Sequence, residues 1–156
     1  MIKFYSLWII SLLLSSSTVF AQDNTSDFKN IRKNAISVSV LGISPLVGIT
    51  YDRIVSENVS LEIGVGIPSF GAGVKFYPFG IKESKFMFHT GLSGTYLYTA
   101  AFGVWDKDED SGIFVGYVPI GVSYFGRKGF NLGADIGPAM ADQTLLYYNL
   151  KLGYRF

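Results

Sequence analysis

YNLKLGYRF, residues 148–156, is a stretch in which every second residue is large and apolar. The residues between them are polar, charged or small. This period of two predicts a β-strand with one apolar face and one polar face. The strand runs to the last residue of the printed chain. Its apolar face consists of Tyr148, Leu150, Leu152, Tyr154 and Phe156.

Seven further runs with the same alternation precede this strand, and turn residues separate them. No stretch after residue 34 keeps a helical period. A tilted strand of about 9–11 residues is long enough to cross a membrane, and closed bacterial membrane barrels contain an even number of strands. The pattern therefore predicts an all-β protein, an eight-stranded antiparallel up-and-down transmembrane β-barrel. The predicted strands are 35–43, 46–55, 59–67, 71–79, 86–99, 113–125, 130–139 and 144–156.

The first 21 residues are typical of a secretory signal peptide. Lys3 precedes a short apolar run at residues 7–14, and the small residue Ala21 fits a cleavage site. The run is shorter than the roughly 20 apolar residues that a spanning helix needs. We expect residues 1–21 to be removed, residues 22–34 to form a flexible periplasmic segment, and residues 35–156 to form the barrel.

The composition argues against several classes of protein. Charged residues make up 16% of the chain, against roughly 25% in a typical soluble domain. Removal of residues 1–21 removes Lys3 and no acidic residue, which leaves 12 basic and 12 acidic residues. A nucleic-acid-binding protein would carry a basic excess, so we expect no nucleic-acid partner. The chain has no cysteine, which excludes a disulfide framework.

Alternation alone leaves open which face of the strands is outside, because a soluble lipocalin-like carrier also alternates, with its apolar face inward. Two features favour a membrane barrel. The polar face consists mostly of small residues, which suit the narrow interior of an eight-stranded barrel better than many large apolar residues would. Aromatic residues also gather near the predicted strand ends, as in the two interfacial girdles of membrane barrels.

With the polar face inside, the phase of the strands places three acidic and three basic side chains in the lumen. Buried charges are costly unless they are paired and hydrogen-bonded. We therefore expect an interior ion-pair network that fills the barrel and prevents it from acting as a pore. The predicted network consists of Asp52, Glu62, Lys75, His89, Asp135, Lys151 and Arg155.

The connections fall into two groups. Three short polar turns, at 56–58, 80–85 and 126–129, lie on the side of the N-terminal segment, the predicted periplasmic side. The longest connection, 100–112, falls on the opposite side, and short inner turns with longer outer loops are usual in membrane barrels. We expect this outer loop to present Trp105, Asp106, Asp108 and Asp110 to the exterior.

Taken together, the leader, the strand pattern and the C-terminal strand resemble those of small eight-stranded outer-membrane barrels of the OmpA/OmpX type, within the wider outer-membrane β-barrel-domain family. The resemblance implies that the alternating residues from Tyr148 to Phe156 act as the signal read by the barrel-assembly machinery. It also implies an outer-membrane location, contact with lipid and lipopolysaccharide, and a monomer. Function varies among such barrels, so it is not implied.

Two stretches carry residues that could support chemistry. Some outer-membrane barrels that modify lipid A carry a His-x-Ser motif, whereas this chain has His89-Thr90-Gly91. The acidic stretch 106–112 resembles a calcium loop, but the glycine and glutamate positions of an EF-hand hold Ser111 and Tyr117. We expect no cofactor and no catalytic residue. The leading hypothesis is a structural or surface-interaction barrel, and the alternatives are a lipid A-modifying barrel enzyme and a soluble lipocalin-like carrier.

Overall fold

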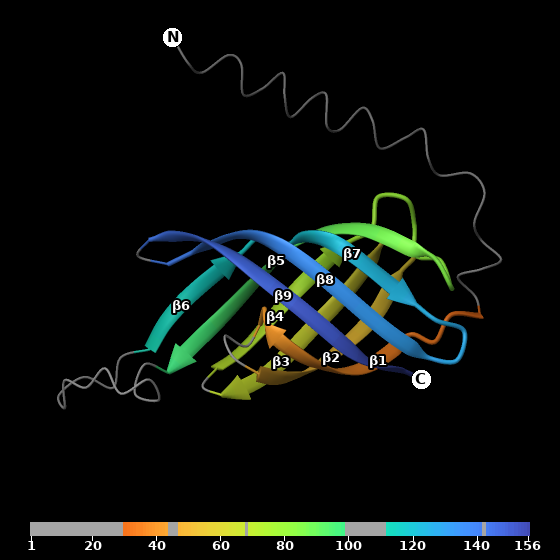
Figure 1. Ribbon diagram of the computed structural model, residues 1–156, viewed down its shortest axis with the longest axis horizontal. Coiled ribbons are helices and arrows are strands. Elements are labelled where there is room, and N and C mark those ends of the chain that lie inside the picture. Colours follow the sequence, from red (N-terminus) through yellow and green to blue (C-terminus); the bar gives the residue numbers. More distant parts are fainter. Residues whose placement is uncertain (1–29, 44–46, 68, 99–111, 142) are drawn as a thin grey trace, which may run out of the picture.

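The computed structural model describes residues 30–43, 47–67, 69–98, 112–141 and 143–156. This part of the chain is built almost entirely of β-strands (Figure 1). No helix within it is long and apolar enough to cross a membrane. The strands are β1 (Asn34–Leu41), β2 (Val47–Ser56), β3 (Val59–Ile67), β4 (Ser69–Phe76), β5 (Phe86–Tyr98), β6 (Gly112–Tyr117), β7 (Ile120–Phe125), β8 (Phe130–Met140) and β9 (Thr144–Arg155).

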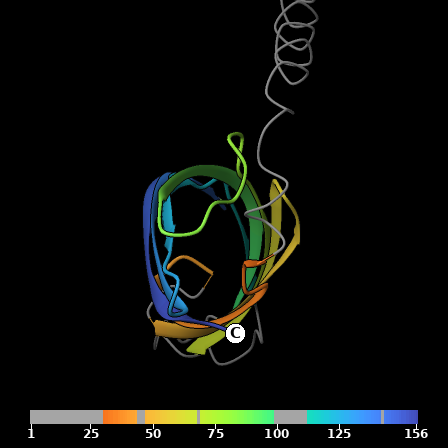
Figure 2. The same ribbon diagram turned by 90° about the vertical axis from the view of Figure 1, so that its right-hand side faces the viewer.

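The strands form one closed antiparallel sheet. From β1 to β6 and from β7 to β9 each strand pairs with the next one in the sequence, and β9 pairs back onto β1 from Ala35↔Arg155 to Leu41↔Asn149. Both β6 and β7 lie between β5 and β8, so they occupy a single position in the wall. Nine strand segments therefore make eight wall positions, and the predicted eight-stranded antiparallel barrel is confirmed. Figure 2 looks along the barrel and shows the closed ring.

The predicted run 113–125 is divided at Val118 and Pro119. Proline has no N–H group, so the backbone ladder cannot continue through it. The backbone there still forms hydrogen bonds to both sides, because Val118 N donates to Pro138 O at 3.1 Å and Gly91 N donates to Pro119 O at 3.0 Å. The strand therefore keeps its place and its phase through the interruption.

The prediction for the fourth strand was displaced, because β4 spans Ser69–Phe76 and not 71–79. The strand ends early because Pro78 cannot donate to a ladder. It begins early because Ser69 still pairs with Gly66 of β3. Tyr77 continues the direction of the strand, and its N–H donates to Asn58 O at 2.8 Å.

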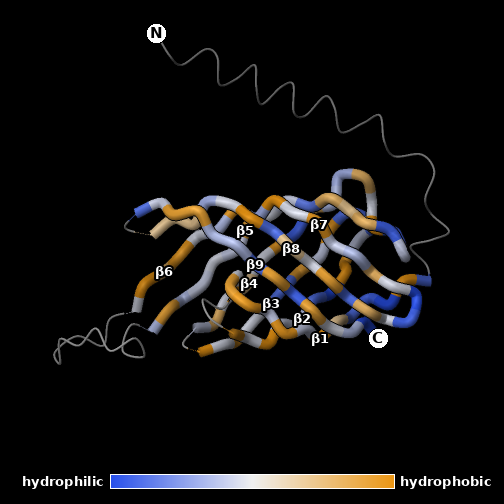
Figure 3. Tube along the Cα trace, in the orientation of Figure 1, coloured by the Kyte–Doolittle hydropathy of each residue, from blue (hydrophilic) through white to orange (hydrophobic). Residues whose placement is uncertain are grey.

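The apolar face of the wall points outward and the polar face points inward. On β3, Leu61, Ile63 and Val65 are 48–62% exposed, whereas the intervening Ser60 and Glu62 are at most 3% exposed. The same alternation of apolar and polar residues runs along most of the length of the other strands (Figure 3). The interior of this barrel is thus its polar side, which is the reverse of an ordinary globular core.

The barrel end at which β1 begins and β9 ends is closed by an apolar plug, which we define as Ile31, Ile54, Tyr77, Ile81, Met87 and Phe125. Ile31 precedes β1, and Ile81 comes from the connection between β4 and β5. Residues 30–33 of the predicted N-terminal segment are therefore packed against the barrel, and its earlier residues lie outside the described part. We call this the terminal end, and the opposite end, where β5 and β6 begin to diverge from the β8–β9 hairpin, the loop end.

We expect glycine to be required at position 137 of β8, where β8 lies beside Val118, the residue that follows β6. A Cβ atom there would lie against the backbone carbonyl of Val118, which cannot move without disturbing the hydrogen bond from Val118 N to Pro138 O. Overpacking of this kind costs about 1–3 kcal/mol. Gly137→Ala should therefore lower the urea midpoint of unfolding of the refolded protein.

Gly133→Ala is the matched control, because it also faces inward on β8. A Cβ atom at Gly133 would have its nearest neighbour, the Cβ of Lys151, at 3.7 Å, which is an ordinary contact. Equal unfolding midpoints for the two variants would contradict the packing described for Val118.

Candidate functional site

The middle of the barrel holds all seven residues of the predicted lumen network. They come from six strands and point into the interior, because each lies on the inward phase of its strand. None is more than 6% exposed: Asp52 2%, Glu62 3%, Lys75 6%, His89 0%, Asp135 6%, Lys151 4% and Arg155 2%.

The six formally charged side chains form one continuous series of alternating sign. Glu62 lies at its centre, with its Oε2 at 2.7 Å from Lys151 Nζ and 3.3 Å from Lys75 Nζ. Lys75 Nζ is also 3.3 Å from Asp135 Oδ2, and Lys151 Nζ is 3.8 Å from Asp52 Oδ2. Arg155 pairs directly with Asp52. We call the series the ion-pair chain, and its order is Arg155, Asp52, Lys151, Glu62, Lys75, Asp135.

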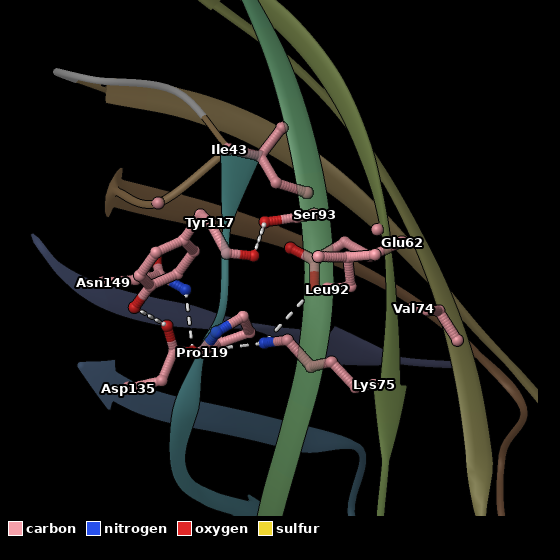
Figure 4. A pocket seen from close by; sticks show the side chains of 12 residues that line it. Ile43, Glu62, Val74, Lys75, Leu92, Ser93, Tyr117, Pro119, Asp135 and Asn149 are labelled. Atoms are coloured by element: carbon pink, nitrogen blue, oxygen red, sulfur yellow. Dashed lines mark hydrogen bonds and ion pairs between the residues drawn. The ribbon is translucent and has the colours of Figure 1, made fainter. Parts of the chain in front are cut away.

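Asp135 is the most highly coordinated member of the ion-pair chain. Its Oδ1 accepts from the Tyr117 hydroxyl at 2.8 Å, and its Oδ2 accepts from Asn149 Nδ2 at 3.0 Å and from Lys75. Figure 4 shows these side chains converging from opposite walls of the barrel. The neutral donors satisfy the lone pairs that the ion pair leaves free, which a buried carboxylate requires.

Arg155 anchors the ion-pair chain at the terminal end. Its guanidinium lies over the ring of Phe125 at 3.9 Å, a cation–π contact, and its Nη1 donates to the carbonyl of Arg32 at 3.1 Å. It therefore joins the last strand, the apolar plug and the segment before β1. An arginine suits this position because its planar group offers five donors and stacks on an aromatic face.

His89 lies between a serine and an aspartate inside the barrel. Its Nδ1 is 3.0 Å from Ser123 Oγ, and its Nε2 is 3.4 Å from Asp135 Oδ2. Tyr77 adds a contact between its hydroxyl and Ser123 Oγ at 3.4 Å, and burial raises the pKa of the Tyr77 phenol above its usual range. The order serine, histidine, aspartate is that of hydrolase triads, but all three side chains are enclosed.

Little empty space remains beside the ion-pair chain. The cavity that borders Glu62, Lys75, Ser93 and Asp135 has a volume of about 10 Å³, enough for about one water molecule (Figure 4). The arrangement can therefore hold the walls of the barrel together across its centre. It offers no room there for a substrate or a hydrated ion.

The two other predicted groups have different outcomes. The residues proposed as an assembly signal lie on the outward face of β9 and just beyond it, with exposed fractions of 53–61%. The outer-loop residues Trp105, Asp106, Asp108 and Asp110 lie outside the described residues. Among the described residues, no group of histidine, cysteine or acidic side chains is arranged to hold a metal ion.

Several interior partners were missed by the analysis of charges. Tyr77, Tyr117 and Ser123 all contribute hydrogen bonds to the network, as does Asn149. The strand phase was the signal that could have found them, since each lies on the inward side. The pairing itself depends on which strands face each other across the lumen.

Comparisons with protein-family models, curated proteins and solved structures found no match for this chain. The sequence and the geometry of the barrel are therefore the basis for inferring its function.

Removing the charge of Glu62 is expected to destabilise the barrel strongly. Glu62→Gln keeps the shape of the side chain but leaves Lys75 and Lys151 with fewer counter-charges in a dry interior. Breaking one partner of a buried ion pair typically costs about 3–5 kcal/mol. The measurement is the free energy of unfolding in urea after refolding into detergent micelles.

Arg127→Met serves as the control, because Arg127 pairs with Glu83 at 3.9 Å and its side chain is 82% exposed. Exposed pairs contribute little, so this variant should unfold like the unaltered protein. A Glu62→Gln barrel as stable as the Arg127→Met barrel would show that the ion-pair chain does not support the fold.

Proposed function

We propose that this protein is an integral outer-membrane β-barrel with a structural or surface-interaction role and a lumen closed by side chains. The observation that carries the proposal is the inversion of the barrel, with large apolar residues outside and a paired charge network inside. In water, such an outer surface would expose far more contiguous apolar area than soluble monomers tolerate. In a lipid bilayer the same surface is the stable one, because the closed sheet satisfies its own backbone groups.

The outward apolar residues cover every side of the barrel. They lie on β1 to β9 without a polar strand between them, and each is at least about one-third exposed. Examples from around the wall are Val38, Ile49, Ile63, Val74, Leu92, Val122, Leu132 and Leu150. A continuous belt favours a surrounding lipid phase over a single protein partner, which would cover only one side.

The alternative of a soluble lipocalin-like carrier requires an apolar interior around a ligand. Here the middle of the interior is occupied by the ion-pair chain and by buried hydroxyl and amide groups. This arrangement disfavours the carrier hypothesis. It also disfavours a steady channel, because Glu62, Lys75 and Asp135 meet where a channel would need open space.

The proposed location brings further expectations. A secretory leader at residues 1–21, recognition of the β9 residues by the barrel-assembly machinery, contact with lipopolysaccharide and a monomeric state are all part of this proposal. The leader pattern and the outward apolar face of β9 support it.

A lipid-modifying enzyme remains the second candidate because of the contact series Ser123, His89 and Asp135. Their enclosure weighs against it, since a nucleophile must reach its substrate. Hydrolysis of lipid A by the purified barrel, lost in Ser123→Ala, would establish this candidate and displace the structural role.

The folded protein is expected in the outer-membrane fraction, with a gel mobility in SDS that changes on boiling. A closed barrel resists SDS until heated, so the unboiled and boiled bands should differ. Planar bilayer recordings of the same preparation should show no steady conductance, because the lumen is filled. A soluble periplasmic protein with the same gel mobility before and after boiling would contradict the proposed location. A stable conductance level would contradict the closed lumen.

Two arginine substitutions on β3 test the membrane directly. Ile63 and Ile67 both point outward, are 57% and 74% exposed, and lie at the middle and at the loop end of the same strand. An outward arginine costs about 2–4 kcal/mol at the bilayer midplane and about 0–1 kcal/mol near the interface. Ile63→Arg should therefore destabilise the refolded barrel in phospholipid vesicles much more than Ile67→Arg does.

The comparison of these two variants is informative in both directions. In a soluble protein both residues would be ordinary surface positions, where substitutions usually change stability by about 0.5 kcal/mol or less. Equal stability of Ile63→Arg and Ile67→Arg would therefore count against a bilayer around the barrel.

A further inference from the structure

At the loop end the barrel wall is notched between β6 and the β8–β9 hairpin. Strands β6 and β8 share only two residue pairs, Gly116↔Met140 and Tyr117↔Ala139. Beyond them, β8 turns back into β9 at Met140↔Thr144, while the four residues Gly112–Val115 of β6 continue along β5. Among the described residues, this part of β6 has a strand partner on one side only.

Within the part of the chain that the structure describes, the backbone groups of β6 at the notch have no ladder partner. Alternate residues of an antiparallel strand direct their N–H and C=O groups to opposite neighbours. The groups of Gly112–Val115 that point away from β5 therefore face the notch. Unpaired backbone groups favour water or a polar ligand atom over hydrocarbon.

A cavity of about 180 Å³ lies behind the notch, inside the barrel. It is bounded by β5, β6, β8 and β9, and its floor is the aromatic pair Tyr117 and Tyr147, whose ring centroids are 5.6 Å apart. Its walls are mainly apolar, in contrast with the charged middle of the barrel. The apolar wall residues are Leu97, Val115, Ala139, Ala141 and Leu145.

The apolar walls of this cavity can be recognised in the sequence. In Ile113-Phe114-Val115 and in Leu145-Leu146-Tyr147-Tyr148 the alternation fails, because both faces of the strand are apolar. The outward residues Phe114 and Leu146 belong to the outer belt and are 67% and 62% exposed. Among the inward residues of the same stretches, Leu145 is still 64% exposed.

The size and the chemistry of the cavity limit what can occupy it. A dry apolar cavity of about 150 Å³ is large enough for a benzene-sized molecule. A cavity of about 180 Å³ therefore accepts a short length of hydrocarbon chain but not a whole lipid molecule or a peptide. The polar backbone edge at the notch is placed to meet a polar group attached to that chain.

We propose that this cavity binds the end of one hydrocarbon chain of an amphiphile, with that chain inside the barrel and the polar group at the edge of β6. The chain would belong either to a free fatty acid or to a membrane lipid that enters through the notch. The lipid source rests on the proposed membrane location, whereas the fatty-acid source does not.

The test uses nuclear Overhauser contacts to methyl groups of the full mature chain, residues 22–156, refolded into phospholipid nanodiscs. In one arm the lipid is deuterated and protonated octanoate is added. In the other the lipid chains are protonated and nothing is added. The reporters are the methyls of the cavity residues Leu97, Val115 and Leu145, and the reference is Leu150 on the outer belt.

We expect contacts from octanoate, from lipid chains or from both to the cavity methyls, and the arm that shows them identifies the source. Ala139→Phe fills the cavity and should abolish these contacts. Ala134→Phe, the control, lies on the outward face of the same strand and should leave them unchanged. Leu145→Gln is the second variant, for use if Ala139→Phe does not fold. It makes the cavity wall less apolar without a packing change, at a position that is 64% exposed, and should reduce the contacts to the remaining cavity methyls.

If the cavity methyls show contacts only to water in both arms, and none to octanoate or lipid chains, this inference is wrong. The proposal of a membrane barrel is then unaffected. If Leu150 shows no lipid contact and the barrel stays in solution, the proposed location fails instead. Octanoate is then titrated against the soluble barrel with the same reporters. Saturable shifts of the cavity methyls that Ala139→Phe abolishes would support the cavity, and their absence would overturn it.

Discussion

The ion-pair chain across the lumen is the interaction on which the rest of this structure depends. Its six charges come from β2, β3, β4, β8 and β9, so it connects walls that share no backbone ladder. A barrel whose apolar residues face outward cannot use an ordinary hydrophobic core. The alternating charges supply cohesion across the centre, and the neutral donors around Asp135 reduce the cost of burying them.

The interior changes character along the barrel axis. At the terminal end the apolar plug of Ile31, Ile54 and their neighbours closes the opening, and Arg155 links it to the charged middle. Toward the loop end the lining becomes apolar again around Leu97 and Val115. The three zones remain separate, because a charged side chain is costly to bury among the apolar residues of either end, and apolar groups cannot satisfy the ion pairs of the middle. Tyr117 marks the boundary between the apolar lining and the charged middle, because it lines the cavity at the loop end and its hydroxyl donates to Asp135 Oδ1.

Much of the fold was predictable because the strand period is local. The alternation in 59–67 predicted β3 to the residue, and the turns at 56–58 and 126–129 were placed correctly. The largest errors arose at prolines. Pro78 ended β4 early, and Pro119 divided one predicted strand into β6 and β7, because a missing N–H group interrupts a ladder whatever the side-chain pattern.

The sequence by itself determined the strand count, the two faces of each strand and the set of charges that share the polar face, because each of these follows from a period of two along the chain. The small residues of that polar face and the aromatic residues near the strand ends indicated that it lies inside. Only the tertiary structure decided which charge pairs with which, since contacts such as Lys75 to Asp135 and Arg155 to Asp52 join strands distant in the sequence. The placement of Ser123 beside His89 and the apolar cavity behind the notch have the same origin. They depend on the register and stagger of the closed barrel, which no single strand specifies.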